Sequence, residues 1–211
     1  MSRALLLLSA VMLAYLAGSF PTAYLVGRAN GIDLRTVGSG NLGATNVQRT
    51  LGWSWGLLVY LVDFLKGFVP TFFLPALVTV ERGWPWGVAM GVAAIAGHVK
   101  PVFLMGKGGG KGVATASGVF LALAVWPTVA AIGAFLVVVV ATRFVSLGSM
   151  VAAVVLAAVL LVQEGAFTPL AWVGCAIAMF VIWAHRENVR RLRRGEERPI
   201  GGRQVTGEAA P

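Results

Sequence analysis

The stretch GHVKPVFLMGKGGGKGVAT, residues 97–115, lies between two long apolar runs and governs how the rest of this sequence is interpreted. Closely spaced glycines allow backbone N–H groups to turn toward an anion, and Lys107 and Lys111 add positive charge at the same place. The following segment, Gly112–Val125, is expected to be helical, so its positive N-terminal end would face the same point. The stretch therefore predicts a phosphate site that uses Gly108, Gly109, Gly110 and Gly112.

The glycine pattern differs from that of a nucleotide-binding P-loop. In a P-loop, a serine or threonine follows the lysine, whereas here Gly108 follows Lys107 and Gly112 follows Lys111. The alternative to a phosphate site is a flexible basic turn at a membrane surface, because basic loops are common on the cytoplasmic face. The loop by itself leaves both interpretations open.

Composition indicates an integral membrane protein. Of 211 residues, 58% are hydrophobic and only 12% are charged, which is too little polar surface to cover a soluble globule. The single cysteine, Cys175, excludes an intramolecular disulfide and is expected to be a small buried hydrophobic residue. The N-terminal apolar run continues to Val26, beyond the length of a signal peptide, so we expect no cleavage there.

Seven apolar segments are expected to form helices, because they lack the alternation typical of barrel strands. Several have only 14 to 18 residues, so half-spanning or broken helices are expected among them. The predicted fold is thus an all-α polytopic bundle of about seven transmembrane helices. The segments are Ala4–Val26, Leu51–Val80, Trp84–Gly97, Gly112–Val125, Thr128–Ala141, Ser149–Val162 and Phe167–Ala184.

The distribution of lysine and arginine predicts the orientation. With the N-terminus outside and the C-terminus cytoplasmic, fourteen of the seventeen basic residues fall on the cytoplasmic side. The same rule requires residues 112–142 to cross twice, with Trp126-Pro127 as the outer turn. We expect one transmembrane catalytic domain, residues 1–195, followed by a flexible polar tail, residues 196–211.

Three further polar regions accompany the glycine stretch. The first inner loop, Gly27–Thr50, is rich in amides, hydroxyls and glycines, and is interpreted either as solvated or as a binder of phosphate and sugar-like hydroxyls. Asp63 and Lys66 lie three residues apart in an apolar helix, which favours a buried ion pair. The short loop at 142–150 carries Ser146 and Ser149, of which one is expected to cap the next helix or to bind phosphate.

The C-terminal segment begins as a basic helix at the membrane surface. Its arginines are explained by contact with anionic lipid headgroups. His185 and Asn188 lie one turn apart on one face, which that charge does not explain.

Several motifs in order resemble the acyl-phosphate-dependent glycerol-3-phosphate acyltransferases of bacteria, the PlsY family, along nearly the whole chain. The motifs are GSGNLGATNVQR at Gly38–Arg49, GHVKPVF and GGKGVAT within residues 97–115, SLGS at Ser146–Ser149, DFLKG in the second helix and HRENVRRLRRGEE in the tail. KGGGKG carries one glycine more than the usual KGGKG, and Lys100 stands where an aromatic residue is common. Of the two lysines beside that glycine run, Lys111 is favoured over Lys107.

The resemblance implies transfer of a fatty acyl group from acyl phosphate to the 1-hydroxyl of glycerol 3-phosphate, forming lysophosphatidic acid and inorganic phosphate. It implies a catalytic set consisting of Ser39, Arg49, Lys111, Ser149, His185 and Asn188. Substrate-binding positions are implied nearby at Asn41, Thr45, Asn46, His98, Lys107, Thr115 and Ser146, with the glycines named above. The resemblance also implies a multi-pass protein of the bacterial inner membrane whose active site faces the cytoplasm.

The residues are compatible with this chemistry. Both substrates carry phosphate and the donor has a good leaving group, so positioning and charge neutralisation supply much of the acceleration. We expect membrane lipids around the chain, no metal or other cofactor, no nucleic acid and no obligatory protein partner. Two other functions remain: a small phosphate-ester or anion transporter, which predicts internal repeats and a mid-membrane site, and a non-enzymatic lipid-binding protein.

Overall fold

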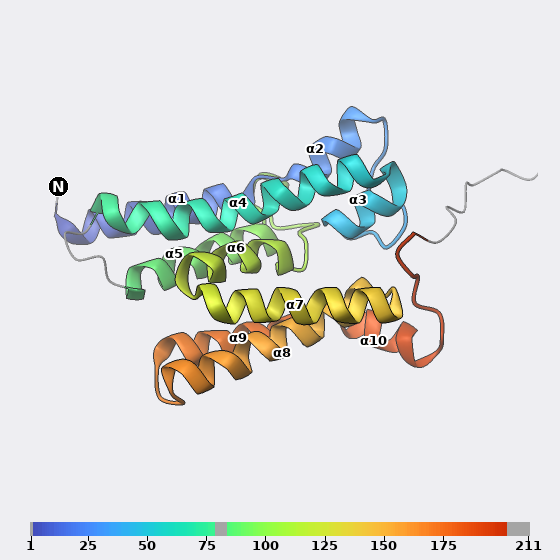
Figure 1. Ribbon diagram of the computed structural model, residues 1–211. Helices are drawn as coiled ribbons and strands as arrows, with labels where there is room; N and C mark the ends of the chain where they lie inside the picture. Colours follow the sequence, from blue (N-terminus) through green and yellow to red (C-terminus); the bar gives the residue numbers. More distant parts are fainter. Residues whose placement is uncertain (1, 79–83, 202–211) are drawn as a thin grey trace, which may run out of the picture.

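The computed structural model describes residues 2–78 and 84–201, and within these ranges all regular secondary structure is helical (Figure 1). The elements are α1 (Arg3–Ser19), α2 (Thr22–Ala29), α3 (Ala44–Leu51), α4 (Trp53–Val78), α5 (Trp84–Val99), the 3₁₀ turn η1 (Val102–Leu104), α6 (Val113–Leu123), α7 (Val125–Thr142), α8 (Val145–Glu164), α9 (Pro169–Ala184) and α10 (Arg186–Arg193). The expectation of an all-α membrane protein is confirmed.

Long apolar helices dominate the described residues. Five spans are long and apolar enough to cross a bilayer, and a sixth is formed if α9 and α10, which meet at 55°, are counted as one. The seventh apolar helix, α6, has 11 residues and reaches roughly 16 Å at about 1.5 Å per residue, about half of a bilayer core. The bundle therefore contains the short and broken helices that the sequence predicted.

The segment 112–142 folds as a half-length helix followed by a full-length one. The two helices run antiparallel in Figure 1, so the chain reverses its direction between them, as predicted. The break lies at Ala124, whereas Trp126-Pro127 was predicted to be the turn. That prediction was wrong because Pro127 fits the first turn of α7, where its missing N–H has no helical acceptor to lose.

Close helix crossings are made at glycines. A Cβ on Gly18 of α1 would lie 2.0 Å from the Ala94 carbonyl oxygen of α5. A Cβ on Gly118 of α6 would lie 2.1 Å from the Phe64 carbonyl oxygen of α4. Small residues let membrane helices approach until their backbones touch, which increases dispersion contacts. These crossings bind α1 to α5 and α4 to α6, and the latter pair forms one wall of the site.

The first inner loop is partly helical, which the sequence did not predict. It consists of the end of α2, an irregular stretch at residues 30–43, and α3. Asn46 of α3 is 2% exposed and organises the stretch through its side chain. Its Nδ2 donates to the Leu34 and Val37 carbonyl oxygens at 3.2 and 3.1 Å, and its Oδ1 accepts from the Ser39 N–H at 2.9 Å.

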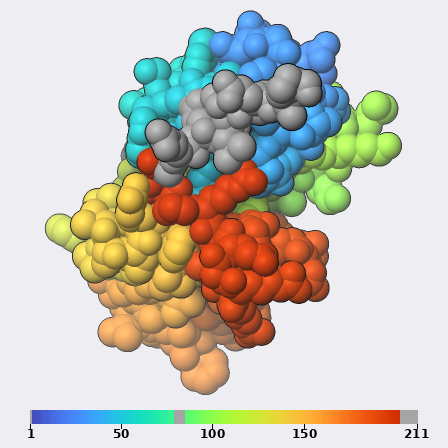
Figure 2. Space-filling view, turned by 90° about the vertical axis from the view of Figure 1, so that its right-hand side faces the viewer, coloured from blue at the N-terminus to red at the C-terminus, as the bar shows by residue number. Residues whose placement is uncertain are grey.

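The C-terminal segment folds back over the polar end of the bundle. Residues 196–201, which were assigned to a tail, contact three other parts of the chain through the side chain of Glu197 and the backbone of Arg198 and Ile200. In Figure 2 this red segment lies between the blue and cyan N-terminal elements and the yellow end of α7 and start of α8. The remainder of the predicted tail, residues 202–211, lies outside the described residues.

Candidate active site

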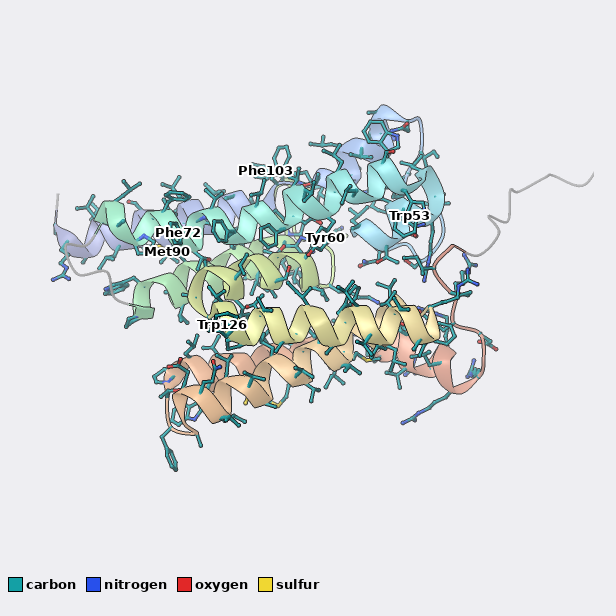
Figure 3. All side chains as sticks on the ribbon, in the orientation of Figure 1. Trp53, Tyr60, Phe72, Met90, Phe103 and Trp126 are labelled. Atoms are coloured by element: carbon teal, nitrogen blue, oxygen red, sulfur yellow. The ribbon has the colours of Figure 1, made fainter. Side chains whose placement is uncertain are left out.

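A cavity of about 500 Å³ opens at the polar end of the bundle and extends between the helices. Its walls come from α3, α4 and α6 on one side and from α7, α8 and the α9–α10 junction on the other. Figure 3 shows Trp53 and Tyr60 of α4, two of its aromatic lining residues, on the side that faces α7. Polar side chains gather at one end of the cavity, namely Ser39, Asn41, Thr45, Asn46, Gln48, Arg49, Lys111, Ser146, Ser149, His185, Asn188 and Glu197.

All six residues of the predicted catalytic set line this one cavity. They come from the first inner loop, the glycine stretch, the start of α8 and the α9–α10 junction, and are separated by up to 149 positions (188 − 39) in the chain. The expectation that distant loops fold together is met for these residues. Their individual roles remain proposals.

Lys111 carries positive charge into the cavity. Its Nζ donates to the Oδ1 of Asn188, which fixes the ammonium at the start of α6. Burial lowers the pKa of Lys111 to about 8, and nearby arginines, Arg191 above all, act in the same direction. Lys107 is exposed and does not line the cavity. The geometry thus favours Lys111 as the key lysine.

Arg49 is the second cation of the cavity. One terminal nitrogen donates to the carbonyl oxygen of Arg198 at 2.5 Å. Its Nε is buried and has no hydrogen-bond partner among residues 2–78 and 84–201. Burial lowers the pKa of Arg49, yet a guanidinium stays charged at neutral pH. A buried cation with an unused donor is suited to receive an anion.

The two serines at the start of α8 do not cap it. The helix begins at Val145, one residue before the first serine, and Phe144 is at the N-cap position. Ser146 donates from Oγ to Glu197 Oε1 at 2.8 Å, and Ser149 donates to the Val145 carbonyl oxygen at 2.9 Å. The capping interpretation is therefore wrong. Both hydroxyls line the cavity, and turning Ser149 toward a ligand would cost only a local backbone contact.

His185 occupies the junction between α9 and α10. Its Nδ1 lies 2.8 Å from the Val181 carbonyl oxygen. Because a carbonyl only accepts, Nδ1 carries the hydrogen, and the Nε2 of the neutral ring is left as an acceptor. Asn188 sits one turn further on and is 6% exposed. The shared face predicted for these two residues is directed at the cavity.

Gly109 and Gly110 pack against the end of α5, whereas Gly108 lies beside the side chains of Arg35 and Leu42. A Cβ on Gly109 would lie 2.0 Å from the Val99 carbonyl oxygen, and one on Gly110 would lie 2.1 Å from Nε2 of His98. Gly108, Gly109 and Gly110 are absent from the cavity lining, as is the buried Thr115. Gly109 and Gly110 therefore serve close packing, and the substrate-binding role expected of Gly108, Gly109, Gly110 and Thr115 stays a prediction.

Helix N-termini are the backbone groups that face the cavity. Four helices begin beside it, with N-cap residues Gly43 (α3), Gly112 (α6), Phe144 (α8) and His185 (α10), and at least one residue from the first turn of each helix lines it. None has a side-chain cap among the described residues. Their first N–H groups and positive dipole ends are thus available to an anion. The predicted contribution of the α6 N-terminus agrees with this geometry.

A second polar cluster lies deeper in the wall. Asp63 and Lys66 form the predicted ion pair, with Oδ1 and Nζ 2.9 Å apart and both side chains less than a tenth exposed. Lys66 also donates to the Phe20 carbonyl oxygen at 3.0 Å. His98 Nδ1 lies 3.9 Å from Asp63 Oδ2, too far for a hydrogen bond. Asp63 and His98 both touch the cavity.

Glu197 is the site residue that sequence reasoning missed. Its side chain is 1% exposed and lies between Ser146, Asn188 and Arg191. The neighbouring Glu196 is exposed, and nothing in a single sequence distinguishes the two. Within the described residues, no three side chains of His, Cys, Asp or Glu come together as metal ligands.

Comparison with known proteins gives a consistent result. A family model described as glycerol-3-phosphate acyltransferase matches residues 8–195. A glycerol-3-phosphate acyltransferase of Geobacter sulfurreducens is 48% identical over 195 residues, covering 91% of this chain and 95% of the relative. One of Anaeromyxobacter dehalogenans is 44% identical over 198 residues, covering 92% and 98%.

Two crystal structures of PlsY (YgiH), an integral membrane glycerol 3-phosphate acyltransferase, resemble the fold. The glycerol 3-phosphate form superimposes with a TM-score of 0.84 at 38% identity and covers 92% of this chain and 96% of the other. The lysophosphatidic acid form gives 0.79 at 37% identity, with 92% and 95% covered. The likeness extends over nearly the full length of both chains.

Proposed function

Because this chain belongs to the glycerol-3-phosphate acyltransferase family, we propose that its cavity binds glycerol 3-phosphate beside a fatty acyl phosphate and joins them. The observation that carries the proposal is the convergence of six polar residues from four chain segments at the mouth of an otherwise apolar cavity. The polar end suits two phosphates, and the apolar interior suits a fatty chain. The matched family consists of acyltransferases, which favours this reaction over a transporter or a passive lipid binder.

The phosphates belong at the polar end. Lys111 and Arg49 supply fixed positive charge, and the starts of α3, α6 and α8 supply N–H groups. Ser39 and Ser149 donate hydrogen bonds, and Asn41 and Thr45 lie within the same lining. Asn46 supports this arrangement indirectly, because its amide holds the Ser39 loop. An anion here would also satisfy the buried Nε of Arg49.

The acyl chain belongs in the apolar part, between α4 and α7. Leu57 of α4 and Leu136 of α7 both line the cavity and are 57% and 54% exposed. A cavity wall that is also outer surface marks an opening, and the surface here is the one that faces lipid. The donor thus enters sideways from the bilayer, while glycerol 3-phosphate enters from the aqueous end.

The reaction needs no enzyme nucleophile. The 1-hydroxyl oxygen of glycerol 3-phosphate attacks the acyl carbonyl carbon, the bond from that carbon to the phosphate oxygen breaks, and inorganic phosphate leaves. A phosphate oxygen takes the hydroxyl proton, so atoms and charge balance. Lys111 and Arg49 stabilise charge on the phosphate as it departs. His185, through Nε2, and Asn188 orient the acceptor.

The orientation of the protein in the membrane follows from the position of its basic loops. The polar end carries the basic loops, so we place it on the cytoplasmic side, with the N-terminus outside. The membrane is then the bacterial inner membrane, where a water-soluble acceptor is at hand. No metal, cofactor or further protein is required by the steps above.

The test compares two lysines of the same loop. Purified protein in lipid cubic phase, given acyl phosphate and glycerol 3-phosphate, should release inorganic phosphate. Lys111→Ala should lower turnover on the order of 10²–10³-fold, because a fixed charge facing the leaving phosphate is lost. Lys107→Ala is the matched control and should stay within about threefold, since an exposed charge contributes little. Equal activity of the two variants would refute the site, and an inert wild-type protein would refute the reaction.

A further inference from the structure

Glu197 is the carboxylate that the C-terminal segment places at the polar end of the cavity. Asp63, which also lines the cavity, is already paired with Lys66. Its Oε1 accepts from Ser146 Oγ and from Asn188 Nδ2, each at 2.8 Å. Its Oε2 accepts from Arg191 Nε at 2.8 Å. The carboxylate is therefore held by α8 on one side and by α10 on the other.

These contacts decide which way the Asn188 amide points. An ionised carboxylate only accepts hydrogen bonds, so the NH₂ group of Asn188 must face Glu197. The Oδ1 of Asn188 is then left facing Lys111, whose ammonium only donates. A reversed amide would place two acceptors together on one side and two donors together on the other. The order Glu197, Asn188, Lys111 is thus fixed by hydrogen-bond polarity.

The charge state of Glu197 agrees with this role. Burial works against ionisation, but hydrogen bonds from its three partners outweigh it, and the pKa of the carboxyl is lowered. Ser146 further ties the carboxylate to the start of α8. Of the two adjacent glutamates, only Glu197 makes these contacts, since Glu196 is exposed.

We propose that Glu197 is a positioning residue of the acyl transfer: through Asn188 it holds the Lys111 ammonium at the place where the substrate phosphate binds. Glu197 itself does not touch substrate. It acts by orienting an amide and by balancing part of the positive charge at the polar end. The inference rests on the proposed function and adds Glu197 to the residues that were given a role in it.

Every charged or titratable group around Lys111 enters the expected pH dependence. Arg191 and Arg186 of α10 and Arg49 of α3 favour the neutral amine, whereas Glu197 favours the ammonium. The remaining neighbour is His185, whose ring is held through Nδ1. Removing the carboxylate charge should thus lower the pKa of Lys111 and weaken its fixation together.

The experiment measures kcat/KM for glycerol 3-phosphate against pH in Glu197→Gln, with Glu196→Gln as the matched control. Glutamine keeps the size of the side chain but allows the Asn188 amide to turn. We expect kcat/KM to fall about tenfold to a hundredfold, the effect typical of a lost charge-assisted hydrogen bond. The alkaline fall in activity should begin at lower pH than in the wild type. Glu197→Asp should keep part of the kcat/KM and shift the alkaline limb less than Glu197→Gln. Glu196→Gln should match the wild type in both kcat/KM and pH profile.

The outcomes are separable. Wild-type and Glu196→Gln protein must release phosphate, and if they do not, the proposed function fails before this inference is reached. If both are active and Glu197→Gln shows an unchanged pH profile, the positioning role is refuted, whatever the loss of rate. A rise in kcat/KM would also refute it, because the carboxylate would then be competing with substrate. Thermal unfolding in detergent identifies a variant that has merely lost its fold, and Glu197→Asp then provides the deciding pH profile.

Discussion

Within residues 2–78 and 84–201, side-chain caps are found at only one of the two ends of the bundle. At the end away from the cavity, Ser2 caps α1 and Thr168 caps α9, each through a hydroxyl that accepts a backbone N–H, while α7 starts there without one. At the cavity end, α3, α6, α8 and α10 begin without a side-chain cap among the described residues. A cap stabilises a helix by about 1 kcal/mol. Leaving it out at four helix starts around one cavity keeps those N–H groups free for a ligand.

Charge separates the two ends as well. Arg49 and Lys111 lie at the cavity end, together with the six described arginines in and after α10. At the other end, the described residues include Arg3 alone among the cations, and Arg82 lies outside the described residues. The free helix N-termini and the cations thus place the reaction at the cavity end, whereas the opposite end has a structural role. This division can be tested by substitutions whose effects should differ in kind.

The largest effect is expected at Arg49, on the chemical end. Arg49→Ala removes a buried guanidinium with an unused Nε and should lower kcat/KM on the order of 10²–10³-fold, with the fold retained. Arg28 is the control, because it is an exposed arginine of the preceding helix outside the cavity lining. Phosphate release by the two alanine variants gives the comparison. Comparable rates would mean that the cavity end has no special anion site.

A smaller effect, on stability, is expected in the scaffold between the ends. Gly118→Ala places a methyl group 2.1 Å from the Phe64 carbonyl oxygen and should cost about 1–3 kcal/mol of unfolding free energy through overpacking. Gly133→Ala in α7 meets nothing within 4 Å and should be neutral or stabilising by about 0.5–1 kcal/mol. Thermal unfolding of both in detergent tests the contrast. Equal melting temperatures would show that the α4–α6 crossing is looser than described.

The smallest effect is expected at the capped end. Thr168→Ala removes the cap of α9 and should reduce stability by about 1 kcal/mol while leaving kcat and KM unchanged. Unfolding and kinetics are measured on the same preparation. A change in KM without a change in stability would contradict the division of the two ends.

The fold was largely predictable, because lipid imposes a simple rule. Continuous apolar runs must become helices, and Asp63 and Lys66 within one of them must find partners. This rule does not predict where one helix ends and the next begins. Ala124 ends α6 without a glycine or proline signal, while Pro127, a nominal breaker, fits the first turn of α7. At this break, tertiary packing and not the intrinsic helix preference of the residues sets where the helices end and begin.

Site residues were predictable where the side chain itself can bind phosphate. They were not predictable where the role of a residue depends on its contacts in the folded chain. Lys111, Arg49 and Ser149 carry their chemistry in the side chain. The glycines of residues 108–110 do not, since the same flexibility serves ligand binding or close packing. Glu197 was hidden because its importance comes from partners 9 and 51 residues away.

The exposed cavity wall at Leu57 and Leu136 has a consequence for how the product departs. Moving a fatty chain of sixteen carbons into water would cost roughly 12 kcal/mol, at about 0.8 kcal/mol for each methylene. Under the proposed function, an opening in the flank of the bundle would avoid this step, because the chain would stay among its neighbours in the leaflet while the ester bond forms. The lysophosphatidic acid product would then return to the leaflet by lateral diffusion.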